Sequence, residues 1–95
     1  MARFNRGETV EIRLWTRDPD TDALFTPSDV PTLVVTDPNG DEFQASDVMT
    51  LISTGYYTYK LPTDADSPLG SYQVLFTVED SGSISLDYGS FELGR

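Results

Sequence analysis

The sequence predicts an all-β sandwich, and three observations support this. Apolar and polar residues alternate with a period of two, as Val10, Ile12 and Leu14 do between Glu11, Arg13 and Trp15. Short β-branched or aromatic segments recur about every ten residues, separated by Gly, Pro and Asp. No segment shows the apolar spacing of an amphipathic helix. We therefore expect about seven strands, packed as two sheets.

The expected strands follow one another along the whole chain. They cover residues 9–15, 32–37, 42–45, 48–52, 56–61, 71–80 and 84–93. The Asp-Pro-Asn-Gly sequence at 37–40 predicts a turn between the second and third strands, because Pro and Gly suit its corners. Ser81, Gly82 and Ser83 predict a tight turn between the last two strands.

The alternation also predicts which side chains form the core. The inward-facing residues are expected to be Val10, Ile12, Leu14, Leu33, Val35, Tyr57, Tyr59, Leu61, Tyr72, Val74, Phe76, Val78, Ile84, Leu86, Phe91 and Leu93. Between Leu86 and Phe91 the apolar phase shifts by one residue. This shift predicts a bulge or bend near Gly89.

The segment 67–72, Ser-Pro-Leu-Gly-Ser-Tyr, predicts a tyrosine corner. In immunoglobulin-like sandwiches a tyrosine at the start of a strand packs its ring inward and bonds its hydroxyl to the preceding loop. Gly70 would allow the close turn and Tyr72 would fasten it. Gly55 and Tyr57 repeat the pattern, either as a second corner or as a plain turn before an aromatic strand.

These motifs together resemble the immunoglobulin-like modules of the macroglobulin type that occur in bacterial and archaeal surface proteins and in virion proteins of tailed viruses. The similar parts are Gly-Glu-Thr-Val at 7–10, the turn at 37–40, Gly-x-Tyr at 55–57, the corner at 68–72 and Phe-x-Leu at 91–93. The resemblance covers nearly the whole chain. It implies a Greek-key immunoglobulin-like sandwich over residues 8–95, after an arm or edge segment at 1–7, and a scaffolding or binding role.

Charge is distributed unevenly in this 95-residue chain of net charge -10. Four of its six basic residues precede residue 18, whereas 14 of its 16 acidic residues follow residue 17. An acidic surface repels phosphates and anionic lipids, so we expect neither nucleic acid nor membrane as a partner. The scarcity of lysine fits either a GC-rich genome or a halophilic protein kept soluble by hydrated carboxylates. No secretory signal or membrane span is expected.

The residue inventory argues against catalysis. The chain has no His and no Cys, which excludes the usual nucleophilic triads and zinc sites. A paired-carboxylate mechanism would need a deep cleft, which so small a sandwich is not expected to form. We therefore expect no enzyme activity and no cofactor.

One acidic segment has the spacing of a calcium loop. Asp18, Asp20, Asp22 and Asp29 occupy its positions one, three, five and twelve. Ala23 stands where such a loop needs Gly, and the flanks are strand-like, so the alternative is an acidic hydrated loop. A bound calcium ion is the only ligand that this segment suggests.

Two groups of residues are candidates for partner binding. Trp15 and Tyr56 lie on the outward phase of their strands, where aromatic rings can bury against a protein or stack on sugars. Arg3, Phe4 and Arg6 form a basic arm that could dock on an acidic neighbour, or could be a frayed terminus or an edge strand.

These features predict a non-enzymatic virion structural protein of a tailed virus, assembled in the host cytoplasm and contacting other subunits in a symmetric assembly. It would be a capsid decoration or turret subunit, or a neck or tail accessory protein. The alternative is a calcium- or glycan-binding immunoglobulin-like module of an adhesin-type protein at a cell surface.

Overall fold

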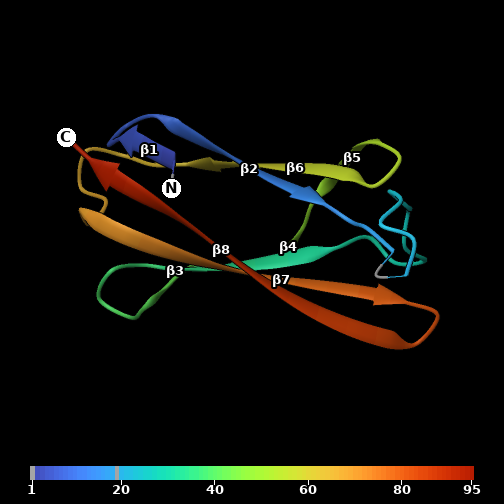
Figure 1. Ribbon diagram of the computed structural model, residues 1–95. Helices are drawn as coiled ribbons and strands as arrows, with labels where there is room; N and C mark the ends of the chain where they lie inside the picture. Colours follow the sequence, from blue (N-terminus) through green and yellow to red (C-terminus); the bar gives the residue numbers. More distant parts are fainter. Residues whose placement is uncertain (1, 19) are drawn as a thin grey trace.

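The computed structural model describes residues 2–18 and 20–95 and contains eight strands (Figure 1). They are β1 (Ala2–Asn5), β2 (Thr9–Trp15), β3 (Thr32–Thr36), β4 (Glu42–Val48), β5 (Thr50–Ser53), β6 (Tyr56–Pro62), β7 (Gly70–Asp80) and β8 (Ser83–Gly94). The described residues include no helix, and therefore none that could cross a membrane. The all-β prediction is confirmed.

The strands form two sheets packed face to face. One sheet has the order β1-β8-β7-β3-β4, and the other has the order β2-β6-β5. The chain passes from one sheet to the other several times, so that strands next to each other in sequence often belong to different sheets. This arrangement is compatible with an immunoglobulin-like sandwich. All neighbouring strands pair antiparallel except β1, which lies parallel to β8 with Phe4 opposite Leu93.

The core lies between the sheets and follows the predicted alternation over most of the chain. Strand β2 alternates exposed and buried residues without interruption. The buried apolar residues are Val10, Ile12, Leu14, Leu33, Val35, Met49, Tyr57, Leu61, Tyr72, Val74, Phe76, Phe91 and Leu93. Phe4, Phe43, Tyr59 and Val78 are partly buried against them.

Met49 marks the point where the chain passes from one sheet to the other. Strand β4 belongs to the five-stranded sheet and β5 to the three-stranded sheet, and Met49 stands between them with 3% of its surface exposed. Its backbone N–H donates to the carbonyl of Pro31 at 2.9 Å. The buried side chain and this hydrogen bond fix the crossing.

Strand β8 departs from the predicted core. Ile84 and Leu86 are 64% and 57% exposed, so their assignment to the core was wrong. The predicted bulge near Gly89 was also wrong, because the pairing of β7 with β8 runs without a shift from Gly70↔Leu93 to Asp80↔Ser83. An unbroken antiparallel register keeps alternate residues on one face, so Ile84 and Leu86 face away from the core that contains Phe91 and Leu93.

The β7–β8 hairpin is the longest part of the fold. Figure 1 shows it crossing the whole molecule below β2 and β6, and the molecule measures 41 × 22 × 19 Å. The turn at Ser81 and Gly82 has positive φ at both positions, 51° and 85°. Such a two-residue turn matches the twist of the flanking strands and sets their register.

Candidate docking surfaces

Trp15 and Tyr56 lie directly opposite each other on the outer face of β2 and β6. Their rings are stacked, with centroids 5.0 Å apart and planes inclined by 21°. Trp15 remains 49% exposed. The two strands thus hold these rings as a flat aromatic surface that a partner could cover.

Arg13 stands on the same face as this aromatic pair. Its Nε atom donates to Oε1 of Glu11 at 2.8 Å, and this bond is the main cause of a raised pKa for the Arg13 guanidinium. Since Glu11 already partners Arg13, the pair adds little net charge to the outer face of β2.

The predicted basic arm is edge strand β1. Phe4 packs edge-on against Phe91, with ring centroids 6.2 Å apart, so its ring serves the domain itself. Arg3 forms an exposed ion pair with Glu92 at 3.1 Å, and the backbone N–H of Arg6 donates to the carbonyl of Gly94 at 2.7 Å. The edge-strand interpretation of this segment is therefore the one that the structure adopts.

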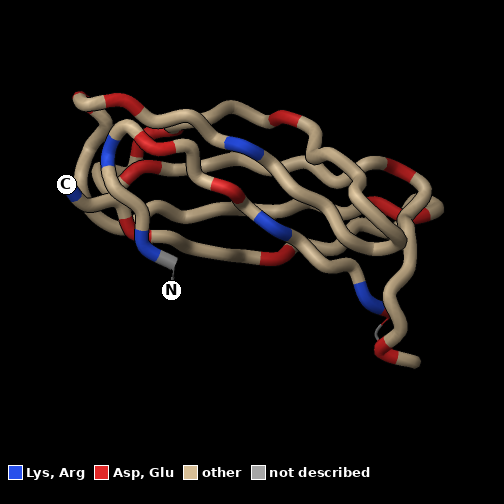
Figure 2. Tube along the Cα trace, turned by 90° about the horizontal axis from the view of Figure 1, so that it is seen from above, with Lys and Arg blue, Asp and Glu red and all other residues tan. Residues whose placement is uncertain are grey.

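The arm and the aromatic pair are not neighbours. Arg3 lies on β1 of the five-stranded sheet, whereas Trp15 ends β2 of the other sheet. Figure 2 shows the basic residues scattered singly, with acidic residues at both ends of the sandwich. The candidate partner-binding residues therefore form two separate surfaces.

The aspartates of the predicted calcium loop are held by internal hydrogen bonds. Oδ1 of Asp18 accepts from the backbone N–H groups of Asp20 and Thr21 at 2.8 and 3.3 Å, and the carbonyl of Asp18 accepts from Asp22 at 2.7 Å. Asp29 is placed elsewhere, with its N–H donating to the carbonyl of Glu79 at 3.2 Å. Among the described residues no three acidic side chains are grouped as metal ligands would be.

The corner at Gly70 and Tyr72 has the hydrogen bond that the motif predicts. The Tyr72 hydroxyl donates to the carbonyl of Pro68 at 2.6 Å, and its ring stacks on Phe91 with centroids 4.9 Å apart. Gly70 has φ 129°, and a Cβ there would lie 3.1 Å from Pro38. This corner fastens the loop to the core.

Gly55 allows the backbone to pass close to the carbonyl of Thr16, whereas Gly70 allows the turn of the tyrosine corner. The φ of Gly55 is 69°, and a Cβ there would lie 2.9 Å from the Thr16 carbonyl oxygen. Tyr57 is buried, and burial raises the pKa of its hydroxyl. Tyr59, next on that face, donates to Asp47 at 2.8 Å, and burial followed by this bond raises its pKa to about 12.

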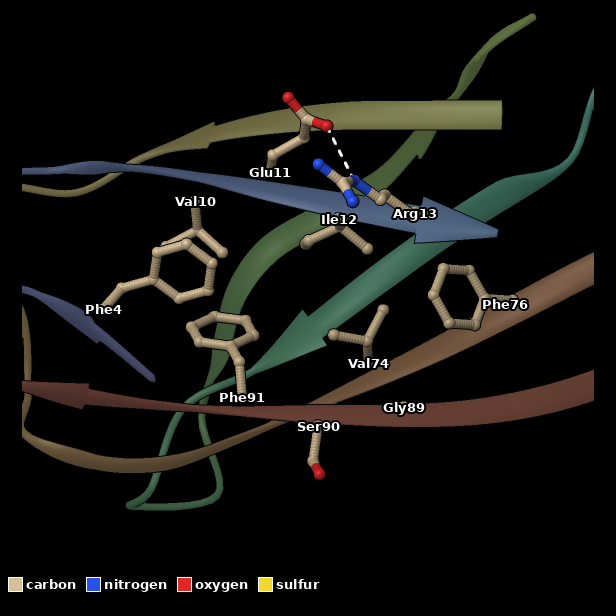
Figure 3. Close-up of a pocket in the computed structure, with 10 residues that line it drawn as sticks. All are labelled: Phe4, Val10, Glu11, Ile12, Arg13, Val74, Phe76, Gly89, Ser90 and Phe91. Carbon is tan, nitrogen blue, oxygen red and sulfur yellow. Dashed lines mark hydrogen bonds and ion pairs between the residues drawn. The ribbon is translucent and has the colours of Figure 1, made fainter. Parts of the chain in front are cut away.

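A cavity of about 400 Å³ opens between β2 and β8 at one side of the sandwich (Figure 3). Phe4 and Phe91 stand at one end of it and Phe76 at the other, with Ile12 and Val74 between. The only titratable side chains that line it are Glu11 and Arg13, which are paired with each other. Apart from Glu11, Arg13 and Ser90, the described side chains that line the cavity are apolar.

Sequence reasoning missed an exposed apolar surface, which we call the outer apolar face. It covers the solvent side of the five-stranded sheet and consists of Val34, Val48, Leu75, Ile84, Leu86 and Tyr88. Leu75 is opposite both Val34 and Tyr88, while Thr32 and Thr77 continue a row between Val48 and Leu86. The register of the β7–β8 turn was the signal that could have revealed this face.

The fold and these surfaces define an immunoglobulin-like β-sandwich with exposed apolar residues on one sheet and an aromatic pair on the other. No protein-family model matches the chain, and a search of curated proteins finds no significant match.

Proposed function

We propose that this protein is a non-enzymatic structural module that docks onto other protein subunits. The outer apolar face carries this proposal. Ile84, Leu86 and Tyr88 are 64%, 57% and 70% exposed, although the rest of the chain is strongly acidic. Contiguous apolar side chains on a soluble domain mark surfaces that become buried against a protein partner.

The charge of the molecule fits such docking. No residue of the outer apolar face is charged, and Glu42, Glu79 and Glu92 stand around it on β4, β7 and β8. A partner could therefore bury the apolar residues while these carboxylates stay hydrated at the rim. Arg3, Arg6 and the Trp15–Tyr56 pair provide further contacts in this proposal.

We further propose that the larger assembly is the virion of a tailed virus, with this protein as a capsid decoration, turret, neck or tail accessory subunit. The resemblance to immunoglobulin-like virion modules and the immunoglobulin-like topology support this choice. The acidic composition also suits a protein that works at high salt.

Purification of the untagged protein from its native source in high-salt buffer tests this function. We expect capsid or tail proteins to copurify at a fixed symmetric ratio. Recovery without any virion protein would contradict the proposal. Val48→Glu should reduce incorporation into particles, whereas Ile52→Glu, at a site of similar exposure on the other sheet, should not.

Glycan binding at a cell surface is a second candidate function, favoured by the exposed Trp15–Tyr56 stack. Retention on a glycan array that Trp15→Ala abolishes would support it. Calorimetry with calcium tests the remaining part of this alternative, since binding below about millimolar concentration is expected only of a true site.

A further inference from the structure

We propose that two copies of this protein associate through the free edge of β8, forming one continuous sheet of ten strands. Strand β1 pairs only with Phe91–Gly94 of β8. The preceding residues of β8, from Ser83 to Ser90, pair with β7 on one side and with no described strand on the other. An uncovered strand edge is a template for pairing with another chain.

The backbone groups that face this edge can be identified. The Gly94 carbonyl accepts from the N–H of Arg6, the residue that follows β1, so even-numbered residues of β8 direct their backbone groups towards the β1 side. The N–H of Tyr88 agrees with this, because its partner is the Asp87 carboxylate at 2.9 Å rather than a strand. Ile84, Leu86 and Tyr88 therefore present N–H and C=O groups to a second copy.

The β8 edge is less protected than the edges formed by β2, β4 and β5. Strand β5 has only four residues, both β4 and β5 have shifted registers, and the β2 edge carries the Glu11–Arg13 pair. The segment 83–90 has no Lys, no Pro and no bulge, and Asp87 is its single charge. Short strands, bulges, prolines and charges are the features that prevent pairing at an edge.

One two-fold register fits this segment. Centred on Leu86, it pairs Ser83–Gly89 of the two copies, with Leu86 opposite Leu86 and Ile84 opposite Tyr88. About six backbone hydrogen bonds would form between the copies. Two of them require the N–H of Tyr88 in each copy to leave the Asp87 carboxylate and donate to the Ile84 carbonyl of the other copy. The three apolar side chains of each copy then lie on the same outer face.

Charge favours this register over its neighbour. Centred on Leu86, it places Asp87 opposite Ser85, whereas centring on Asp87 would set two carboxylates side by side. The hairpin tip of one copy, which carries Glu79 and Asp80, then approaches the end of β1 of the other copy, which carries Arg3. Since each copy carries a net charge of -10, the dimer should become more stable as salt concentration rises.

Sedimentation of the purified chain at several protein and salt concentrations gives the first test. We expect a monomer–dimer equilibrium that shifts to dimer at high salt. Leu86→Lys should abolish the dimer, because two lysines would lie opposite each other. Leu51→Lys adds the same charge at a residue of similar exposure, 49% against 57%, and should leave the dimer intact.

Crosslinking tests the register in a chain that has no native cysteine. Leu86→Cys should form a disulfide-linked dimer under mild oxidation, since its Cα atoms would lie about 5.5 Å apart. Ile84→Cys should not, because the two copies of residue 84 would be separated by about 13 Å along the strand direction alone. A monomer at every concentration, or equal crosslinking of both variants, would overturn the proposal, and neither result depends on the virion function.

Discussion

The two halves of the β7–β8 hairpin have similar side chains and opposite surroundings. In the half that lies under the other sheet, Tyr72 is paired with Phe91 and both are buried. In the half that ends at the turn, Leu86 is paired with Thr77 and is exposed, although the strand is unbroken. Burial in this hairpin therefore depends on the face a residue occupies and on what covers that face, more than on its hydrophobicity.

The largest expected difference between the two halves is in the free energy of unfolding lost when one apolar residue is truncated in each. Phe91→Ala should lower the free energy of unfolding by about 3–5 kcal/mol, because it leaves a cavity beside Phe4 and Tyr72. Leu86→Ala should change it by less than about 0.5 kcal/mol, since the side chain is exposed. Chemical denaturation at a concentration where the protein is monomeric measures both. Equal losses would show that the outer face also packs within the domain.

The hydroxyl groups of the tyrosines in the two halves should also differ in how much they contribute to the free energy of unfolding. Tyr72→Phe removes the hydroxyl that donates to Pro68 and leaves a partly buried acceptor without its donor, so we expect a loss of about 1–2 kcal/mol. Tyr88→Phe removes a hydroxyl from a side chain that is 70% exposed and should have almost no effect on the free energy of unfolding. Denaturation of both variants makes the comparison, and an unchanged Tyr72→Phe variant would mean that the corner bond adds nothing to stability.

The same contrast explains which parts of the fold could be predicted from the sequence. The alternation in β2 and the Gly70–Tyr72 motif depend on local patterns, and the structure has the expected burial and hydrogen bond there. Hydrophobicity alone predicts a buried Leu86, because it does not show which residue of β7 lies opposite. The turn at Ser81 and Gly82 already places Asp80 opposite Ser83, and counting back from it would have put Leu86 on the face of Thr77.

The candidate sites were harder to predict because they depend on distances between strands. Trp15 and Tyr56 were both placed on outward phases, and only the β2–β6 register shows that they are direct neighbours. Asp29 has calcium-loop spacing from Asp18, yet the chain between them turns so that Asp29 bonds to β7 instead. Spacing along a loop does not by itself determine where its carboxylates meet, because the path of the chain between them also decides this.

Alkaline pH should weaken the buried half of the hairpin. Burial raises the pKa of Tyr72, and the nearby charges of Asp37 and Asp64 raise it further. A pKa that is higher in the folded than in the unfolded chain gives stability that is complete below about pH 10 and is lost as the pH rises towards the folded value.

Denaturation measured from pH 8 to pH 11 checks the predicted direction in which the free energy of unfolding changes as Tyr72 ionises. The free energy of unfolding should fall above about pH 10, and the fall should be smaller in Tyr72→Phe, which has no hydroxyl to ionise. Part of the fall should remain, because the pKa values of Tyr57 and Tyr59 are also raised in the folded chain. Tyr88→Phe serves as the control, and if it flattened the profile as much as Tyr72→Phe, the loss would not originate in the buried half.

The smallest predicted effect concerns Asp87, where the buried and exposed halves of β8 meet. Its carboxylate accepts from the N–H of Tyr88, a donor that the proposed dimer needs, and it also adds one negative charge per copy at the shared edge. Asp87→Ala should therefore lower the dissociation constant of the dimer by about two- to fivefold. Asp66→Ala removes the same charge from an exposed loop residue outside the strands, and should change this constant less. If the dissociation constant of the dimer were no lower in Asp87→Ala than in Asp66→Ala, Asp87 would not lie beside the second copy. Substitution of a residue at the shared edge frees a backbone donor and also removes a local repulsion, whereas substitution of Asp66 does neither at that edge.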